Sequence, residues 1–386
     1  MLLRGLRRQN RWDDDGHITT VCLRDTRMSE RCASLFRDWN TLNVSLQSCV
    51  QQDMLERRLE HRTMVYHVTS DECSGSDHDE HPLDSLTFLC HICPREEALD
   101  PNVSAVIKQL LPALLSWFDD VQRQTDRSLD INTRENLIET CVAISKVNAS
   151  HSSQKALVLA QVLYDQDMPS RFSLAIAKVQ SVALRRQERH AESDQKIEEA
   201  MYRVDPQDVR TTCLIGQLHL SLADNAILRN QYESAIHWVE EIDLAISLGT
   251  PDQVSPLVWQ LCEHKWIVTG RIHCFQGRFE DAIEVLRPCL AVSHISSVSN
   301  THHVVRQLAD AYVELDHPAQ AKALLDEHLT KILQQGKQGS SPYNRLLLSY
   351  ADAEIALGRY VDAHALLDEI EQSFKRTSPV SQTDQL

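Results

Sequence analysis

Glycine and proline are both scarce in this sequence of 386 residues. There are 10 glycines and 12 prolines, whereas average usage would give roughly 27 and 19. Few glycines disfavour turn-rich β architectures and glycine-rich phosphate-binding loops, because both use backbone conformations that glycine adopts most easily. The chain is instead rich in Ala, Leu, Glu and Gln, which favour helix. We therefore expect an all-α protein.

Long apolar runs are missing as well. No stretch approaches the length of about 18 apolar residues that a membrane-spanning helix needs. The arginine-rich start is not followed by an apolar segment and meets Asp13 within a few residues, so we expect neither a secretory signal nor an organelle presequence. The 11 cysteines are then expected to be thiols in a reducing compartment. We expect the protein in the cytoplasm, with the nucleus as the alternative.

Positively charged residues are fewer than negatively charged ones in this sequence. The chain has 39 Lys and Arg against 55 Asp and Glu, a net charge of −16. Nucleic acids and anionic membranes are bound by clustered Lys and Arg, so we expect neither as a partner. The patterns GxxxxGK[ST], HExxH and GxSxG are absent, which removes the motifs of phosphate-binding loops, zinc proteases and serine hydrolases. We expect no enzyme, no catalytic residue and no cofactor.

Composition changes along the chain suggest four regions. Residues 1–69 are predicted to be an N-terminal helical region, and residues 70–100 an acidic loop or linker that contains Cys and His. Strong helical periodicity begins at Pro101 and predicts a helical repeat domain over residues 101–376. The polar residues 377–386 are predicted to be a disordered tail.

The acidic loop contains the one group of residues with metal-ligating chemistry: Cys73, His78, His81, Cys90 and Cys93. Two residues between Cys90 and Cys93 would let both thiolates reach one tetrahedral Zn²⁺, and the two histidines could complete a set of four ligands. The alternative is a plain loop with buried thiols. A single CxxC is a weak signal, so no metal site is predicted, and the zinc question stays open.

Four segments share one pattern: QGRFEDAIEVL, LGRYVDAHALL, RNQYESAIHWV and LDHPAQAKALL. Each has a turn residue, then an aromatic residue or proline, then an alanine and finally an aliphatic residue. A tight turn followed by a small side chain lets two antiparallel helices approach closely, and the aliphatic residue then fills the space between them. The four sets are Gly277, Phe279, Ala282 and Leu286; Gly358, Tyr360, Ala363 and Leu367; Asn230, Tyr232, Ala235 and Val239; Asp316, Pro318, Ala321 and Leu325.

This pattern resembles the tetratricopeptide repeat (TPR) family. The segment with Trp266, Gly270, Gly277, Phe279, Ala282 and Leu286 fits the family spacing best, although Thr269 and His273 depart from it. Two fainter repeats are centred on Ala156 and Ser193, and the spacing between repeats exceeds the 34 residues of the family. The resemblance implies a right-handed TPR-like α-solenoid of helical hairpins with longer helices, preceded by the additional N-terminal helical region.

In the family, the first helices of the hairpins line a concave groove that binds partner proteins. Carried over to this sequence, the groove contains six Lys and Arg against four Asp and Glu, so we expect an acidic or carboxylate-bearing partner segment. The predicted contact residues are Lys178, Arg186, Arg271, Phe275, Arg306 and Arg345. The other carried-over positions are Arg185, Asp224, Ile227, His264, Ile267, His303, Asp310, Glu314, Leu348 and Asp352.

The resulting prediction is a non-enzymatic scaffold or adaptor that binds a protein segment in its groove. A first alternative is a regulatory subunit or sensor arm of a larger signalling or transcription-regulating assembly. A second is a zinc-dependent enzyme or enzyme subunit. Self-association stays open, because no feature of the sequence decides it.

Overall fold

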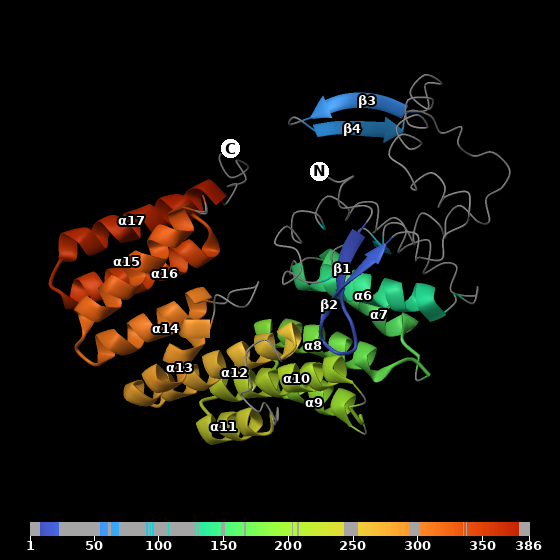
Figure 1. Cartoon of the computed structure of the whole chain (residues 1–386), viewed down its shortest axis with the longest axis horizontal. Helices are drawn as coiled ribbons and strands as arrows, with labels where there is room; N and C mark the ends of the chain where they lie inside the picture. Colours follow the sequence, from blue (N-terminus) through green and yellow to red (C-terminus); the bar gives the residue numbers. More distant parts are fainter. Residues whose placement is uncertain are drawn as a thin grey trace, which may run out of the picture. The chain divides into compact units, whose positions relative to one another are not determined.

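The computed structural model describes residues 8–22, 55–60, 63–68, 90–91, 93, 95, 107, 129, 131–147, 151–165, 167–202, 204–206, 208–242, 254–292, 301–334, 336 and 338–377 (Figure 1). The chain divides into two compact units, Met1–Leu214 and Ile215–Leu386, which we call unit 1 and unit 2. The division falls inside the repeat domain predicted for residues 101–376, within one helix.

The described part of the chain is dominated by helices that pair into antiparallel hairpins (Figure 1). Adjacent helices in the chain pack against each other, α6 on α7, α8 on α9, α12 on α13, α14 on α15 and α16 on α17. The helices are α6 (Ile131–Val147), α7 (His151–Leu163), α8 (Ser170–Arg186), α9 (His190–Met201), α10 (Val209–Leu228), α11 (Tyr232–Glu240), α12 (Pro256–Phe275), α13 (Phe279–Val292), α14 (Thr301–Glu314), α15 (Pro318–Gln334), α16 (Ser341–Ala356) and α17 (Tyr360–Thr377).

The repeat pattern sets the hairpin turns. Helices α11, α13, α15 and α17 each begin at the aromatic residue or proline of the pattern. The turn residue two positions earlier adopts a left-handed conformation in all four hairpins, with φ between 58° and 75°. Glycine adopts this conformation without strain, and Asn and Asp tolerate it better than other residues. These turn residues are Asn230, Gly277, Asp316 and Gly358.

The small residues of the pattern are buried, as predicted. Ala235, Ala282 and Ala321 are fully buried, and Ala363 is 2% exposed. The fainter markers Ala156 and Ser193 are fully buried too. A small side chain at these positions brings the two helices of a hairpin close together.

The aliphatic position of the last repeat was predicted wrongly. Leu367 is 44% exposed, whereas Ile370, three residues later, is buried in the core of unit 2. Within the described residues no helix follows α17, so its outer face has no neighbour to pack against, and Leu367 lies on that face.

The prediction of a helical region over residues 1–69 is wrong for the residues that the structure describes. They form two antiparallel hairpins: β1 (Arg8–Trp12) pairs with β2 (Ile18–Cys22), and β3 (Leu55–Glu60) pairs with β4 (Thr63–Val68). β-branched and aromatic residues in β2 and β4 favour strands. The first turn uses Gly16 at φ 74°, while Asp13 accepts a hydrogen bond from the His17 amide at 2.7 Å. An Asp-Gly pair between short strands is a hairpin signal.

Each unit has its own apolar core. In unit 1, residues of α6, α7 and α8 pack together with Ile107, Cys90 and Cys93. In unit 2, α14 packs on α12, α13, α15 and α16, with Leu286, Leu308 and Leu346 among the buried residues. No helix in the described part of the chain is long and apolar enough to cross a membrane.

Candidate functional site

The first helices of the last three hairpins form one layer in unit 2. Helix α14 contacts both α12 and α16, while α13 packs on α14 and α15 on α16. Side chains that sit at corresponding positions of α12, α14 and α16 can therefore gather on one face. Most of the predicted contact residues belong to these three helices.

Five basic side chains gather on this face, and we call them the cationic cluster: His264 on α12, His302, His303 and Arg306 on α14, and Arg345 on α16. The imidazole rings of His302 and His303 lie 4.1 Å apart between centroids and are tilted by 39°. The positive charges of Arg306 and Arg345 disfavour protonation of both rings. His264 also acts on His303, so the cluster spans all three helices.

The environment of the cluster keeps its two central histidines neutral. Burial, followed by the charges of Arg345 and Arg306, lowers the pKa of His302 to about 4. Burial, followed by His302, Arg345, Arg306 and His264, lowers the pKa of His303 to about 3. At neutral pH the fixed positive charge of the cluster therefore comes from the two arginines.

The arginines of the cluster have no carboxylate partner in the described part of the chain. Neither Arg306 nor Arg345 lies within 4.0 Å of an Asp or Glu oxygen there, and the buried Nε atom of Arg306 has no hydrogen-bond acceptor. Asp310, one turn from Arg306, accepts a hydrogen bond from the Ser349 hydroxyl at 2.6 Å instead. Arg345 is exposed, whereas Arg306 is half-buried and also interacts electrostatically with Asp310.

Arg271 is in a different situation. It forms an ion pair with Asp224, a second residue predicted to line the groove. The Asp224 carboxylate neutralises the charge of Arg271, so this residue is a weaker candidate for binding an anion than Arg306 or Arg345.

The other residues predicted to line the groove differ in exposure and in position. Phe275 is 57% exposed and stacks on Tyr232 with ring centroids 6.3 Å apart, so it remains a candidate contact. Ile227 and Ile267 are buried in the core and cannot contact a partner. Lys178 and Arg186 lie on α8, which belongs to unit 1, whereas the cationic cluster belongs to unit 2.

Sequence reasoning missed His302. Only His303 was assigned to the groove, because the alignment with the family selects one position per helical turn. The available signal was the spacing of His302 and Arg306, four residues apart on α14, which places them on the same side of the helix.

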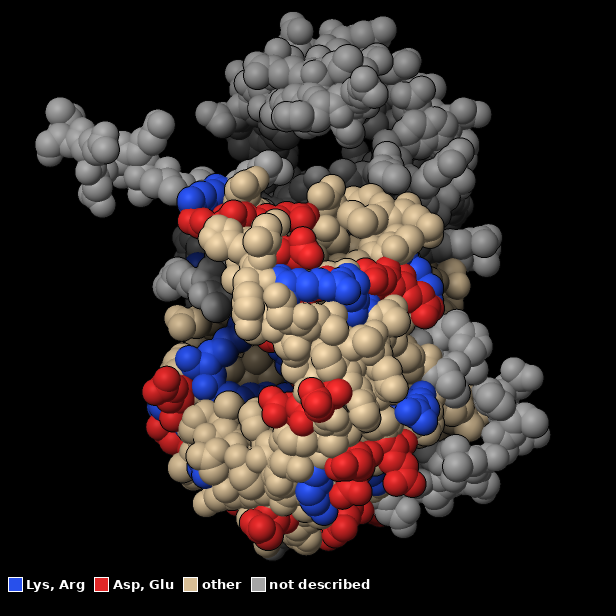
Figure 2. All heavy atoms as spheres, turned by 90° about the vertical axis from the view of Figure 1, so that its left-hand side faces the viewer, with Lys and Arg blue, Asp and Glu red and all other residues tan. Residues whose placement is uncertain are grey.

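Charges of both signs are mixed on the side of unit 2 that Figure 2 shows. Figure 2 looks onto the side with α13 to α17, where blue Lys and Arg atoms and red Asp and Glu atoms alternate with uncharged ones, and blue atoms border one hollow. Because neither positive nor negative charge dominates the side shown in Figure 2, attraction for an acidic segment has to come from a local group of cations such as the cationic cluster.

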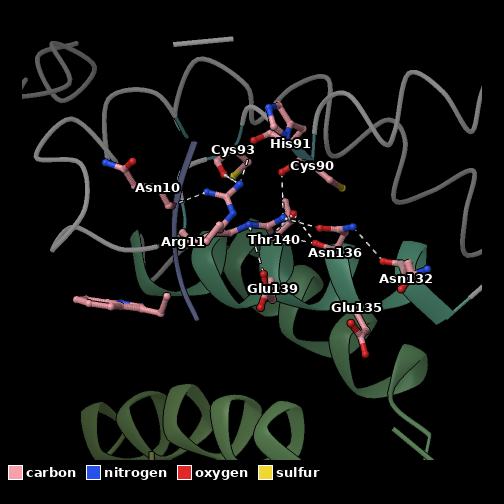
Figure 3. A network of polar contacts seen from close by, with 12 residues as sticks. Asn10, Arg11, Cys90, His91, Cys93, Asn132, Glu135, Asn136, Glu139 and Thr140 are labelled. Carbon is pink, nitrogen blue, oxygen red and sulfur yellow. Dashed lines mark hydrogen bonds and ion pairs between the residues drawn. The ribbon is translucent and has the colours of Figure 1, made fainter. Parts of the chain in front are cut away.

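A second polar group lies in unit 1, around Glu139 on α6 (Figure 3). The carboxylate is 3.0 Å from Arg210 and 3.8 Å from Arg95. Arg95 also donates hydrogen bonds to the carbonyl oxygens of Cys90, at 3.0 Å, and Asn136, at 2.9 Å. Arg11 on β1 donates to the carbonyl oxygen of His91 at 3.0 Å.

This network, which we call the Glu139 network, connects chain segments that are far apart in sequence. Burial alone would raise the pKa of Glu139, but Arg95, Arg210 and Arg11 together hold it at about 2. A single carboxylate thus balances several guanidinium groups. Its partners bond to backbone carbonyls of the same unit, so we interpret the network as structural.

The proposed zinc ligands are only partly within the described residues. Cys73, His78 and His81 lie outside them. Cys90 and Cys93 are buried with Cys141 in the core of unit 1, and the described residues contain no group of three or more side chains that could hold a metal ion. Burial raises the pKa of Cys90, that of Cys93 to about 12, and that of Cys141 well above the ordinary value.

These thiols are expected to be unreactive in the folded protein. Thiolate is the nucleophilic form, and both burial and the raised pKa suppress it. Iodoacetamide at pH 8 should leave Cys90, Cys93 and Cys141 unmodified under native conditions and alkylate all three in urea, as measured by peptide mass spectrometry. Fast native labelling of any of them would contradict this placement of the thiols.

Comparison with known proteins supports the fold. No protein-family model matches the sequence, and no curated protein matches it. Among solved structures, aspartyl phosphate phosphatase F from Bacillus subtilis is similar over 90% of this chain and 85% of its own, with a TM-score of 0.53 at 13% identity. A putative kinesin light chain from Podospora anserina with TPR-like repeats covers 55% of this chain with its whole length, at a TM-score of 0.42 and 16% identity. The described helices form an α-solenoid of TPR-like helical hairpins, and the two β-hairpins precede it in the chain.

Proposed function

We propose that this protein is a non-enzymatic scaffold or adaptor that binds an acidic, carboxylate-bearing segment of a partner protein on the face formed by α12, α14 and α16. The cationic cluster is the observation that supports this function. TPR-like solenoids offer extended surfaces to protein partners, and this face carries two arginines without a carboxylate partner in the described part of the chain.

Guanidinium groups suit this task. Arg presents planar, paired donors that match the two oxygens of a carboxylate. Arg306 and Arg345 come from neighbouring helices that contact each other, so two carboxylates of one segment could be held at once. Because the helices are already packed, binding orders little more than the partner, which lowers its entropic cost.

Nearby residues add to the face. The exposed ring of Phe275 offers apolar contact area next to Arg271 on α12. The buried thiols of both units support a reducing compartment, in keeping with a cytoplasmic or nuclear protein. The proposal assigns no reaction and no cofactor to this chain.

Reversing the charge of both arginines, Arg306→Glu with Arg345→Glu, is expected to weaken partner binding about tenfold or more, because attraction for carboxylates becomes repulsion. Partners would be captured from native cells with the full chain, identified by mass spectrometry, and their affinities measured with purified components. Helical content and thermal stability should stay close to those of the parent protein.

The matched control is Lys331→Glu with Lys375→Glu. These lysines lie on α15 and α17, are largely exposed and pair with Glu327 and Glu371 of their own helices, so the control changes the net charge equally. Loss of binding in both double variants would show that the overall charge of the protein, and not the cationic cluster, controls the affinity. Unchanged binding in both would place the interface elsewhere.

A further inference from the structure

The two central histidines of the cationic cluster are unusual for an anion-binding face. A protonated imidazole would add positive charge where an acidic segment is expected to bind, yet in the free protein both rings are neutral at pH 7. They are close together, and the groups that lower the pKa of His303 come from all three helices: Arg306 on α14, Arg345 on α16 and His264 on α12. Asp310 lies further along α14, near Arg306.

We propose that the His302–His303 pair links binding to protonation: the pair takes up protons when an acidic segment occupies the cationic cluster, so the segment is held more tightly at lower pH. This inference rests on the proposed function, because it concerns the same face and the same kind of ligand.

The reason lies in what holds the rings neutral. Apart from burial, the forces that disfavour their protonation are the charges of Arg306 and Arg345 and the proximity of the two rings. A bound carboxylate neutralises those arginine charges and offers an acceptor to an imidazolium N–H. Each change favours the protonated ring. Both rings also lie in the first turn of α14, where the helix dipole further favours a bound anion.

The direction of the pH dependence follows from this linkage. Burial, the largest cause of the lowered pKa of both rings, persists in the complex, but neutralising the arginine charges moves the pKa of a ring from about 4 or about 3 toward the ordinary value near 6.5. The ring then binds a proton over this range, and affinity rises as pH falls. One such histidine strengthens binding by at most about tenfold between pH 7.5 and 5.5, by the same linkage relation that applies to folding. Aspartate side chains of the segment stay mostly ionised over this range.

The probe is a synthetic hexa-aspartate peptide with both ends blocked, titrated calorimetrically into the full chain. Measurements at pH 7.5, 6.5 and 5.5, each in two buffers of different ionisation enthalpy, give both the affinity and the number of protons taken up. For one responding ring we expect about 0.2 to 0.5 of a proton to be taken up at pH 6.5, and an affinity about three- to tenfold higher at pH 5.5 than at pH 7.5.

The His302→Gln, His303→Gln double variant should lose both the proton uptake and the pH dependence of peptide binding, whatever its affinity at pH 7.5. The control variant is His364→Gln, which alters a histidine on α17 that is 77% exposed and pairs with Asp368 of its own helix. It should behave like the parent protein. Imidazole NMR titrations of the unmodified protein, with and without peptide, test the same point without any substitution, since two histidine signals should shift their pKa upward on binding.

The outcomes separate the two proposals. Peptide binding without proton uptake, or with pH dependence that survives in the double histidine variant, would overturn the proton linkage and leave the proposed function standing. Absence of peptide binding at every pH, with equal behaviour of the Arg306→Glu, Arg345→Glu variant, would overturn the cationic cluster as a carboxylate site and the linkage with it.

Discussion

Replacing Glu139 by glutamine is expected to lower the free energy of unfolding of unit 1 by about 2 to 4 kcal/mol. The substitution keeps the shape of the side chain and removes its charge. Arg95, whose side chain is only 6% exposed, and Arg210 would then lack their counter-charge. Breaking a buried ion pair by removing one partner is costly because the other charge stays buried without compensation. Since Glu139 is itself 21% exposed, water offsets part of that cost.

Urea unfolding followed by circular dichroism measures the effect, and hydrogen exchange of α6 peptides assigns it to unit 1. Glu192→Gln is the control: it removes a carboxylate from an exposed pair with Arg189 on the surface of the same unit, where hardly any change in stability is expected because water screens the pair. Equal stability of the Glu139 variant and this control would show that the Glu139 network does not stabilise the fold.

The pH dependence provides a second readout for Glu139. Its pKa in the folded protein, about 2, lies below the ordinary value. The carboxylate therefore contributes stability that is fully present above about pH 4.5 and is lost as pH falls toward 2. The glutamine variant should lack this component, so its stability should fall less steeply with acid over that range.

Replacing Gly270 by alanine is expected to destabilise unit 2 by about 2 to 4 kcal/mol. A Cβ atom on Gly270 would lie 2.6 to 2.8 Å from three carbon atoms of the Leu286 side chain. Leu286 is fully buried and belongs to α13, the helix that packs on α12. The clash outweighs the gain of up to about 1 kcal/mol that alanine gives over glycine within a helix.

A double-mutant cycle with Leu286→Ala distinguishes a clash from other effects. Leu286→Ala alone should cost about 2 to 5 kcal/mol, because it leaves a cavity. In its presence Gly270→Ala should be nearly neutral or stabilising, since the added methyl group then enters free space. Additive losses in thermal or urea unfolding would show that Gly270 and Leu286 are not in contact and that the register of α12 on α13 is wrong.

The hairpin turns could be predicted because their determinants are local. The turn residue, the aromatic residue or proline and the alanine lie within five positions of each other, and each has a preference that depends on its own backbone conformation or on the helix directly beside it. The same reasoning failed for residues 1–69. There, Asp13 and Gly16 mark a hairpin turn. The neighbouring arginines suggest a basic, helical start instead, and the turn signal is overlooked.

The candidate site was predicted only in outline. Position along the first helices identified Arg306 and Arg345, because family spacing and helical periodicity place them on the exposed side. The same positions included Ile227 and Ile267, which are buried, and omitted His302. Periodicity marks a side of a helix, whereas burial depends on which neighbouring helix covers that side and how closely.

The sequence by itself determined the fold class, the hairpin boundaries and the buried small residues, because helix periodicity and turn conformation are properties of short segments. Only the tertiary structure decided which charges are paired. Arg271 meets Asp224 across 47 positions of sequence, and Glu139 meets Arg210 across 71, whereas Arg306 and Arg345 meet no carboxylate among the described residues. Electrostatic energy depends on distances of a few ångströms between side chains, and packing of separate helices sets those distances.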